Sequence, residues 1–505
     1  MAIGKICGIE TEYGIVHRGL AESNPVTASS LLINAYVSEL AVTAAAGSPP
    51  VGWDFEDESP GRDARGRAPA DAAPPEVETH LVNAVLTNGA RFYVDHAHPE
   101  VSTPECADAR AVVVFDRAAE VIVARAMAAA GRMLPPGQDI VVHKNNSDGK
   151  GNSYGCHENY LMDRAVPFGR IVTAATTHFV TRQVFTGSGK VGAEASGAGP
   201  GAPEVPYQLS QRADFFEAEV GLETTLKRPI VNTRDEPHAD AQRYRRLHVI
   251  AGDANLAEVA TFLKVGSTAI VLAMVEDEAL DRSLALRNPV AAVRAVSHDP
   301  TLATVVELAD GPSMTALEVQ FELLARAQKW AEEHGLDAVG GDAVGGEVLR
   351  RWEQVLTGLE ADPDSVAGQV DWVAKRRLIQ GWVDRHDATW ADPRVAALAL
   401  QYHDLRPERS LARRLGLERI TGDDEVARAV TEPPTDTRAY FRGRCLAKFA
   451  SSIVAANWDS LVFDVGAEPL RRVPMMEPSR GTEAHVGRLL DECATPAELV
   501  ARLSS

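Results

Sequence analysis

The chain has 505 residues, of which 45% are hydrophobic and 24% are charged, so its composition is that of a folded protein with a sizeable core. Its formal net charge of −20 opposes non-specific binding to nucleic acid. The five cysteines are scattered and never form a Cys-x-x-Cys pair, which argues against a structural zinc site and predicts reduced thiols in a cytoplasmic protein.

The amino-terminal segment alternates apolar and polar residues, which predicts a strand within residues 3–16 rather than a secretory signal. Side chains two apart on a strand point the same way, so Glu10 and Glu12 share a face. A helix is expected from Asn24 to about residue 43. The most apolar helical stretch, 109–130, carries several charges, so we expect no membrane span.

Apolar residues show no regular helical or strand spacing over residues 44–78, which are rich in Gly, Pro, Asp and Ala. A stretch so poor in periodic apolar residues predicts a mobile insertion loop. Loops this long inside a compact domain are often lids or binding loops. We therefore expect the segment to gate a ligand or control turnover rather than to form essential core.

A second polar strand follows the insertion and places Arg91, Tyr93 and Asp95 on one face, shortly before Glu100. If this strand pairs with the first, carboxylates from both line one surface. Hard oxygen ligands without thiolates suit Mg²⁺, which proteins usually bind through a few carboxylates and nucleotide phosphates. An ordinary solvated sheet face is the alternative, and it applies most strongly to Glu12.

The remaining chain predicts mixed helices and strands. Helices are expected at 109–132, 168–186, 256–276 and 437–456, a mainly helical region at 317–404, and strands at 138–144 and 244–250. The Pro-rich segment 432–435 is the most credible linker. It predicts a large domain of residues 1–431 and a small carboxy-terminal domain of residues 432–505.

Four motifs together resemble the family of Pup ligases and Pup deamidases, which belongs to the glutamine synthetase-like carboxylate-amine ligases. The motifs are Gly-Ile-Glu-Thr-Glu-Tyr-Gly at 8–14, Tyr-Val-Asp with His-Pro-Glu-Val-Ser-Thr-Pro-Glu-Cys at 93–106, Ser-Tyr-Gly-Cys-His-Glu-Asn-Tyr at 153–160 and Asn-Thr-Arg-Asp-Glu-Pro-His-Ala-Asp at 232–240. The resemblance runs on through Trp458 to residues 471–478. It implies an α+β fold: a curved, mostly antiparallel sheet packed by helices, with a small carboxy-terminal domain.

The resemblance also implies ATP and Mg²⁺ as cofactors. Glu10, Tyr93 and Glu100 would bind the metal, and His157 and His238 would complete the metal and phosphate shell. A tyrosine is an unusual ligand unless the cation lowers its pKa, so Tyr93 is alternatively a hydrogen-bond donor beside the metal. Arg91 would contact the ATP phosphates, Thr103 the nucleotide and Trp458 the adenine, although a tryptophan ending the helix 437–456 could equally be core.

Asp95 is the expected catalytic residue, acting either as a nucleophile that forms a short-lived anhydride or as a general base toward water. In this family the scissile bond is the side-chain amide of the carboxy-terminal residue of Pup, a small protein modifier. That residue is a free Gln or is joined to a lysine of a pupylated protein. Arg234, and more weakly Arg212 and Arg243, are candidates to hold the carboxy-terminal carboxylate of Pup, by charge and motif position only.

The long insertion is typical of the branch that hydrolyses amides, because the ligase branch joins the same strands by a much shorter connection. The spacer between Tyr-x-Asp and Pro-Glu also looks one residue shorter than in the ligase. We therefore expect a Pup deamidase and depupylase whose partners are Pup and pupylated proteins, not nucleic acid or membrane. The alternative is a Pup ligase that joins the Glu of Pup to lysines and consumes ATP.

Overall fold

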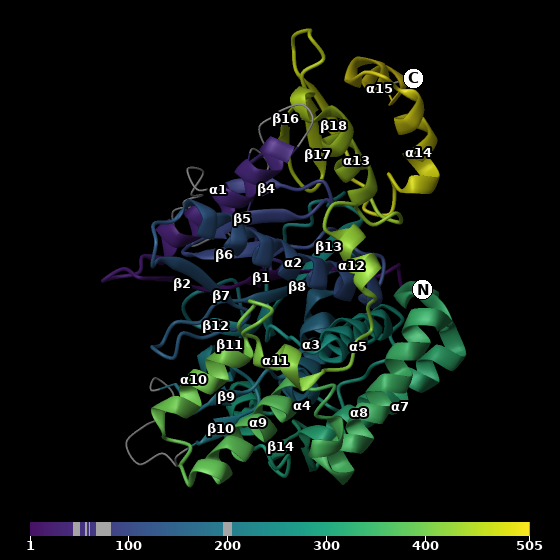
Figure 1. The fold of residues 1–505 in the computed structure, drawn as a ribbon. Helices are drawn as coiled ribbons and strands as arrows, with labels where there is room; N and C mark the ends of the chain where they lie inside the picture. The colour runs from purple at the N-terminus through teal and green to yellow at the C-terminus, as the bar shows by residue number, and fades with distance from the viewer. Residues whose placement is uncertain (44–50, 56–57, 60, 67–81, 195–204, 504–505) are drawn as a thin grey trace.

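The computed structural model describes residues 1–43, 51–55, 58–59, 61–66, 82–194 and 205–503. Within these residues ten strands form one sheet, which crosses the upper half of the molecule in Figure 1. In spatial order the strands are β13 (Tyr244–Gly252), β8 (Cys156–Asp163), β1 (Cys7–Glu12), β6 (His98–Ser102), β5 (Arg91–Asp95), β4 (Asn83–Val85), β3 (Gly52–Trp53), β16 (Ile453–Ala456), β17 (Ser460–Phe463) and β18 (Arg471–Pro474).

Neighbouring strands in this sheet run antiparallel except for β3 and β16, which confirms the expected α+β fold with a mostly antiparallel sheet. Four two-stranded pairs lie outside it in the described chain. They are β2 (Gly14–Arg18) with β7 (Asp139–His143), β9 (Lys190–Val191) with β10 (Tyr207–Gln208), β11 (Phe216–Gly221) with β12 (Arg228–Asn232) and β14 (Val305–Glu307) with β15 (Ser313–Thr315).

One face of the sheet is apolar and is covered by helices. Ile9, Phe92 and Val101 belong to the main hydrophobic core. Against these strands pack α1 (Pro25–Thr43) and α2 (Ala109–Met133), and α5 (Glu258–Glu276) packs against the neighbouring strand β8. The side chain of Asp108 caps α2 by accepting a hydrogen bond from the Ala111 amide, which satisfies a donor that the first helical turn leaves free. The opposite face of the sheet is left for polar side chains.

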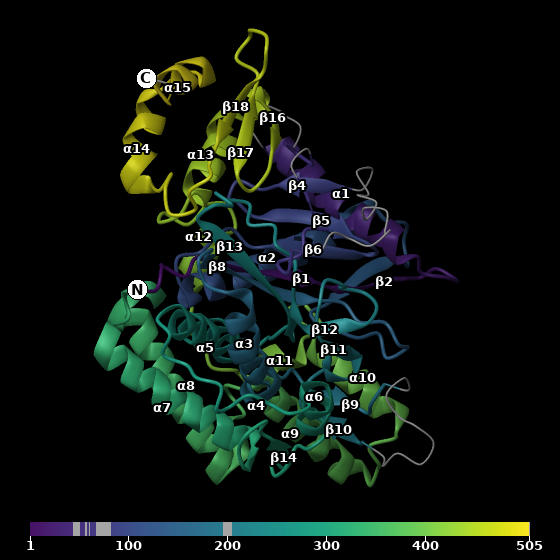
Figure 2. The same cartoon turned by 180° about the vertical axis from the view of Figure 1, so that it is seen from behind.

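The other helices form the lower part of the molecule and the carboxy-terminal end (Figures 1 and 2). They are α3 (Phe168–Thr181), α4 (Gln183–Thr186), α6 (Pro289–Ser297), α7 (Ala316–His334), α8 (Glu347–Ala361), α9 (Asp371–His386), α10 (Pro393–Tyr402), α11 (Leu411–Leu415), α12 (Asp423–Ala429), α13 (Ala439–Phe449), α14 (Glu483–Glu492) and α15 (Pro496–Leu503). The helix predicted at 437–456 ends at Phe449, and its last four residues, Ile453–Ala456, are strand β16 instead. They form a strand because they pair with β17 and β3.

The carboxy-terminal end has a second hydrophobic cluster, which includes Phe441, Leu461 and Leu499. Val51, Trp53 and Val85 from the amino-terminal part complete this cluster, and β16 extends the main sheet through β3. The division at residue 432 stays a prediction, and the structure adds that one sheet runs across it.

Part of the predicted insertion loop is ordered into the fold. Residues 44–50, 56–57, 60 and 67–78 of that segment lie outside the described residues. The rest includes β3, whose Trp53 is 6% exposed. Val51 and Trp53 of this segment belong to a hydrophobic cluster, because tertiary pairing supplies the partners that the local sequence lacks. That the segment gates a ligand or controls turnover rather than forming essential core stays a prediction.

Among the described residues, one helix is long and apolar enough to cross a membrane by length and composition, namely α5. Its whole apolar window is buried inside the protein, which is the environment of a core helix. The most apolar helix is thus α5 and not the segment 109–130.

Candidate active site

The polar face of the sheet brings the two acidic motifs together. Strand β1 pairs with β6 so that Glu12 lies opposite Glu100, and β6 pairs with β5 so that Glu100 lies opposite Tyr93. Residues directly opposite each other in an antiparallel pair share a face. One oxygen from each of Glu12, Asp95 and Glu100 lies within 4.8 Å of the others. The expected second strand is in fact the hairpin β5–β6, and β6 lies between β1 and β5, so direct pairing of β1 with the strand of Asp95 is wrong. The expectation that carboxylates from both segments line one surface is confirmed.

A second group of ligand-type atoms adjoins the first. Glu10 lies opposite His157 in the pairing of β1 with β8, and one ligand atom from each of Glu10, His157 and His248 lies within 4.8 Å of the others. Nδ1 of His157 is 3.6 Å from Oε2 of Glu10. Asn159 donates a hydrogen bond of 2.8 Å to the other oxygen of Glu10 and so fixes its orientation.

The position of the His157 ring depends on a glycine. A Cβ atom on Gly155 would lie 2.2 Å from Nε2 of His157, closer than any real contact. The amide of Gly155 also donates a hydrogen bond of 2.8 Å to Glu12. Gly155 in the motif Ser-Tyr-Gly-Cys-His therefore lets the backbone approach both groups of ligands.

On the polar face of the sheet, Glu100 lies among other carboxylates that repel its negative charge. Its side chain is buried, and burial together with the charges of Asp95, Glu12 and Glu10 raises the pKa of Glu100 well above its ordinary value. For Glu10, burial also acts to raise the pKa, but the contacts with His157, His248 and Arg246 outweigh it and hold the pKa well below its usual range. A cation among the three carboxylates would relieve their repulsion.

Tyr93 donates a hydrogen bond of 2.5 Å from its hydroxyl to Glu100. Burial raises the pKa of Tyr93 well above its ordinary value, and the nearby charge of Glu100 adds to this. A phenol that holds its proton so firmly is better suited to orient Glu100 than to ligate a metal. This geometry favours the second of the two roles expected for Tyr93.

Asp95 ends β5 at the open side of the carboxylate group. Its side chain is 37% exposed, and Oδ2 lies 3.0 Å from Nδ1 of His96. Burial acts to raise the pKa of Asp95, but the hydrogen bond and charge of His96, with His157 and Arg91, lower it below the ordinary value. Asp95 therefore presents an ionised carboxylate that a substrate can reach.

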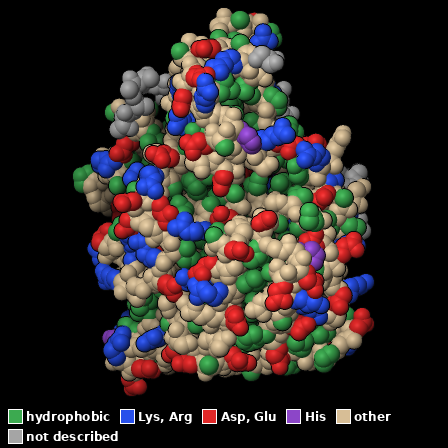
Figure 3. All heavy atoms as spheres, turned by 90° about the vertical axis from the view of Figure 1, so that its right-hand side faces the viewer, with side chains coloured by type: hydrophobic (Ala, Val, Ile, Leu, Met, Phe, Trp, Pro, Cys, Tyr) green, Lys and Arg blue, Asp and Glu red, His purple; other side chains and the backbone are tan. Residues whose placement is uncertain are grey.

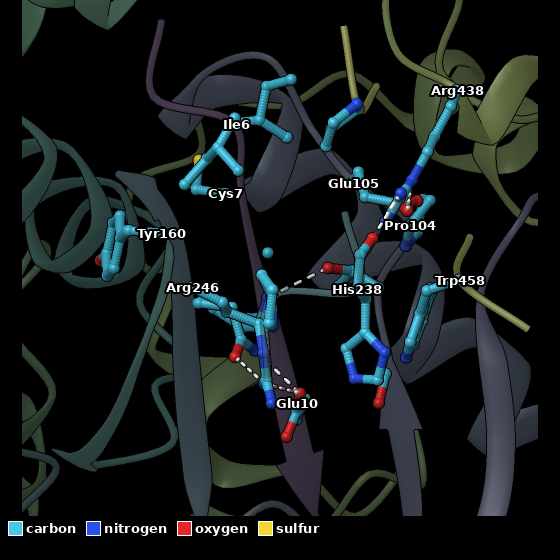
Figure 4. Close-up of a pocket in the computed structure, with 18 residues that line it drawn as sticks. Ile6, Cys7, Glu10, Pro104, Glu105, Tyr160, His238, Arg246, Arg438 and Trp458 are labelled. Atoms are coloured by element: carbon cyan, nitrogen blue, oxygen red, sulfur yellow. Dashed lines mark hydrogen bonds and ion pairs between the residues drawn. The ribbon is translucent and has the colours of Figure 1, made fainter. Parts of the chain in front are cut away.

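A pocket opens beside the second group of ligands, between the sheet and the carboxy-terminal end (Figure 4). Apolar residues such as Ile6 and Ile9 form part of its wall. Thr103, His238 and Trp458, which sequence analysis singled out, also line it, together with Glu105 and Arg438, which it missed. Trp458 lies in the turn between β16 and β17, not at the end of a helix.

Arg91 lies between two aromatic rings at the edge of this region. Its guanidinium carbon is 3.9 Å from the ring centroids of both Trp53 and Tyr93, and its Nε donates a hydrogen bond of 2.9 Å to Asn83. Trp53 in turn contacts Trp458 edge to face, with 5.2 Å between ring centroids. The ordered part of the insertion thus supports two residues expected to bind nucleotide.

The three candidate arginines for the substrate carboxylate lie in different surroundings. Arg212 is 2% exposed and donates to the Tyr154 carbonyl, and its Nε has no hydrogen-bond partner in the described chain. Arg234 follows β12, and its Nε is likewise buried without a partner there. Arg243 is 58% exposed and forms an ion pair with Glu477 at the surface.

Two further histidine assignments follow from the structure. His238 lines the pocket beside Trp458 and is not part of either group of ligands within 4.8 Å, whereas His248 is. His248 could have been found from sequence, because it lies two residues after Arg246 on a predicted strand and so shares its face. Glu158 points to the opposite face, where it pairs with Arg182, and so is excluded from the metal site.

The chain was compared with known proteins. A family model described as Pup-ligase protein matches residues 5–462. A depupylase from Acidothermus cellulolyticus is 52% identical over 99% of both chains, and a Pup deamidase/depupylase from Mycobacterium tuberculosis is 48% identical over 99% of both chains.

Solved structures agree with these similarities. A complex between Pup and its ligase PafA superposes with a TM-score of 0.79 at 32% identity, covering 97% of this chain and 92% of that one. A structure of PafA with ADP gives a TM-score of 0.73 at 35% identity, covering 81% of this chain and 89% of that one.

Proposed function

The chain belongs to the Pup-ligase family, and we propose that it is a Pup deamidase and depupylase. It converts the carboxy-terminal Gln of Pup to Glu and cleaves the isopeptide bond between Pup and a lysine of a modified protein. The observation that carries this proposal is the near-full-length similarity to enzymes named for these reactions, at 52% and 48% identity.

Conjugation of Pup is the second candidate, because the solved neighbours with high TM-scores are ligases. Curated Pup ligases are 41–42% identical over 81% of this chain, whereas the two hydrolases are 52% and 48% identical over 99% of it. The hydrolase therefore fits better. The cytoplasm remains the predicted location, and the five free, buried cysteines fit a reducing compartment.

ATP and Mg²⁺ are the proposed cofactors. The pocket lined by Thr103, His238 and Trp458 would hold the nucleotide, and the two adjoining groups of carboxylates and histidines would hold the metal. The donor set fits a hard cation, and the raised pKa of Glu100 marks where positive charge is missing. When bound, the cation would polarise the scissile carbonyl.

Asp95 is the proposed catalytic residue because it is the accessible carboxylate of the first group. As a nucleophile, its oxygen bonds to the amide carbon, the C–N bond breaks with protonation of the leaving amine, and water then hydrolyses the anhydride. As a general base, it takes a proton from water while the water oxygen bonds to that carbon. Both routes release ammonia or a lysine amine.

Arg234 and Arg212 are proposed to hold the carboxy-terminal carboxylate of Pup, since each has a buried Nε without a partner in the described residues. A planar guanidinium binds two carboxylate oxygens at once. The ion pair with Glu477 makes Arg243 the weakest of the three candidates.

The test is an intact-mass assay of Pup ending in Gln and of a purified conjugate, each incubated with enzyme, ATP and Mg²⁺. We expect a one-dalton gain on Pup and release of free target, and a loss of at least 10²-fold in rate for Asp95→Asn. Growth of a Pup adduct on lysine-bearing proteins, without hydrolysis, would instead establish the ligase.

A further inference from the structure

Three charged residues outside the two ligand groups join the sheet to the carboxy-terminal end. Glu105, just after β6, accepts a hydrogen bond of 2.7 Å from Nε of Arg438 and bonds to both terminal nitrogens of Arg442. The arginine side chains are 4% and 0% exposed, and that of Glu105 is 14% exposed. Burial acts to raise the pKa of Glu105, but the two arginines outweigh it and lower the pKa to about 2.

The two arginines also hold the backbone of the two aromatic residues at the pocket. Arg438 donates a hydrogen bond of 2.6 Å to the carbonyl of His238, and Arg442 donates one of 3.0 Å to the carbonyl of Trp458. Both rings line the pocket, as Figure 4 shows for their side chains. The carboxylate of Glu105 therefore binds two arginines that lie one turn apart at the start of α13. These arginines in turn bind the segments that carry the His238 and Trp458 rings.

These segments need such support. His238 has a φ of 46°, a left-handed conformation that is strained for a non-glycine residue and persists only where the surroundings fix it. Both His238 and Trp458 lie between regular elements rather than within them. The guanidinium carbon of Arg442 also lies 5.0 Å from the Trp458 ring, so the same residue fixes the backbone and contacts the indole.

We propose that Glu105, Arg438 and Arg442 form a positioning clamp that sets the separation of His238 and Trp458 and so determines the affinity for the nucleotide. This inference rests on the proposed function, since it assumes that nucleotide occupies this pocket. It assigns no role in bond breaking to the clamp. The clamp links the carboxy-terminal end to a site whose carboxylates come from the amino-terminal half.

The test compares Glu105→Gln with Glu258→Gln. Glu258 is a matched control, because it is a buried glutamate that also faces two arginines, Arg117 at 3.3 Å and Arg419 at 3.4 Å, but does not line the pocket. Measurements are the dissociation constant for ATP by calorimetry, the KM for ATP and kcat on Pup ending in Gln, and backbone hydrogen exchange at 236–240 and 457–460.

For Glu105→Gln we expect at least a tenfold rise in the ATP dissociation constant and KM, kcat at saturating ATP within threefold of the parent, and faster exchange in both segments. For Glu258→Gln we expect lower stability with an unchanged ATP dissociation constant. A folded Glu105→Gln protein with parental ATP affinity, or an equal rise in both variants, would overturn the clamp.

Arg438→Lys guards against a failure of Glu105→Gln to fold, because it keeps the charge but loses the planar donor set. We expect it also to weaken ATP binding at least tenfold, and parental affinity would overturn the clamp. Failure of the proposed function is distinguishable, since the parent protein itself would then not hydrolyse Pup ending in Gln, whatever the ATP affinities of the variants.

Discussion

At the scale of single residues, two features orient the ligand-type side chains on the polar face: the close approach of the Gly155 backbone to His157, and the hydrogen bond from Tyr93 to Glu100. His157 reaches Glu10 only because Gly155 has no side chain, and Tyr93 holds Glu100 through a hydrogen bond of 2.5 Å. Substitution of these neighbouring residues is therefore expected to disturb the site, as substitution of the carboxylates would. Supporting groups of this kind set ligand orientation, and their loss typically costs 10- to 100-fold in metal affinity.

Gly155→Ala is expected to weaken Mg²⁺ binding by about 10- to 100-fold, because the new Cβ would displace the His157 ring. Mg²⁺ titration of hydrolysis and of thermal stability measures this. Gly131→Ala is the control, since nothing lies within 4 Å of a Cβ there. Equal Mg²⁺ dependence in both variants would contradict the role given to Gly155.

Lys375 is a buried lysine that lies away from the polar face of the sheet. Its Nζ lies 2.6 Å from both the Gly189 carbonyl and Nε2 of His403, and burial lowers its pKa to about 7, although Asp371 and Asp253 act to raise it. Between pH 7 and the unfolded value of 10.5 the unfolded chain binds more protons, so this group makes stability rise with pH.

Lys375→Met is expected to remove that rise, which amounts to about 3 kcal/mol between pH 7 and pH 9.5. Urea unfolding of parent and variant at both pH values measures the difference. Lys329→Met, at a side chain 74% exposed, should keep the parental slope. The same slope in Lys375→Met as in the parent would refute this account.

At the scale of elements, the two-residue strand β3 joins the two parts of the main sheet. It pairs with β4 on one side and β16 on the other, and so joins the amino-terminal strands to the carboxy-terminal ones. Its Trp53 contacts both Arg91 and Trp458. An insertion that looked structureless in sequence therefore supplies a ring that supports Arg91 and Trp458.

Trp53→Ala is expected to raise the KM for ATP several-fold and to lower stability by about 3 kcal/mol, since it removes a buried ring from between Arg91 and Trp458. Trp330→Ala is a matched control, because both indoles are buried and both donate to a carboxylate, Glu58 or Asp277. The control should lose stability without any change in KM. A similar KM in both variants would exclude a nucleotide role for β3.

At the scale of the whole molecule, two hydrophobic clusters share one sheet. The face drawn in Figure 3 carries acidic and basic side chains interspersed, so it offers a partner mixed charge despite the net charge of −20. The continuous sheet predicts that both ends of the chain unfold together.

Differential scanning calorimetry of the full chain is therefore expected to give one transition, shifted upward by ATP with Mg²⁺, because a ligand that binds only the folded state stabilises it. The control is ATP without the metal, which should produce a smaller shift. Two separated transitions, with only one moved by ATP, would show that the regions on either side of residue 432 are independent domains.

Much of the fold was predictable from sequence where apolar residues recur at regular helical or strand spacing. The helices at α1, α2 and α5 and the strand at β13 were expected close to their observed bounds, because each carries a long apolar pattern. The strands expected at 3–16 and from Arg91 onward were located, but each is divided into two strands. Strand β16 was missed because residues 453–456 also fit a helical pattern, and only pairing with β3 and β17 selects the strand. Strand β3 was missed because a two-residue strand has no period to detect.

The sequence alone determined the chemistry of the site: alternation on β1 and β5 placed Glu10, Glu12, Tyr93 and Asp95, and the motifs gave the family. Tertiary structure alone decided which residues from distant segments complete it. It brought in His248, excluded Glu158, and joined Glu105 to Arg438 and Arg442, which are more than 300 positions later in the chain. The physical reason is that alternation fixes the side of a strand on which a residue lies, whereas strand register and packing fix its neighbours.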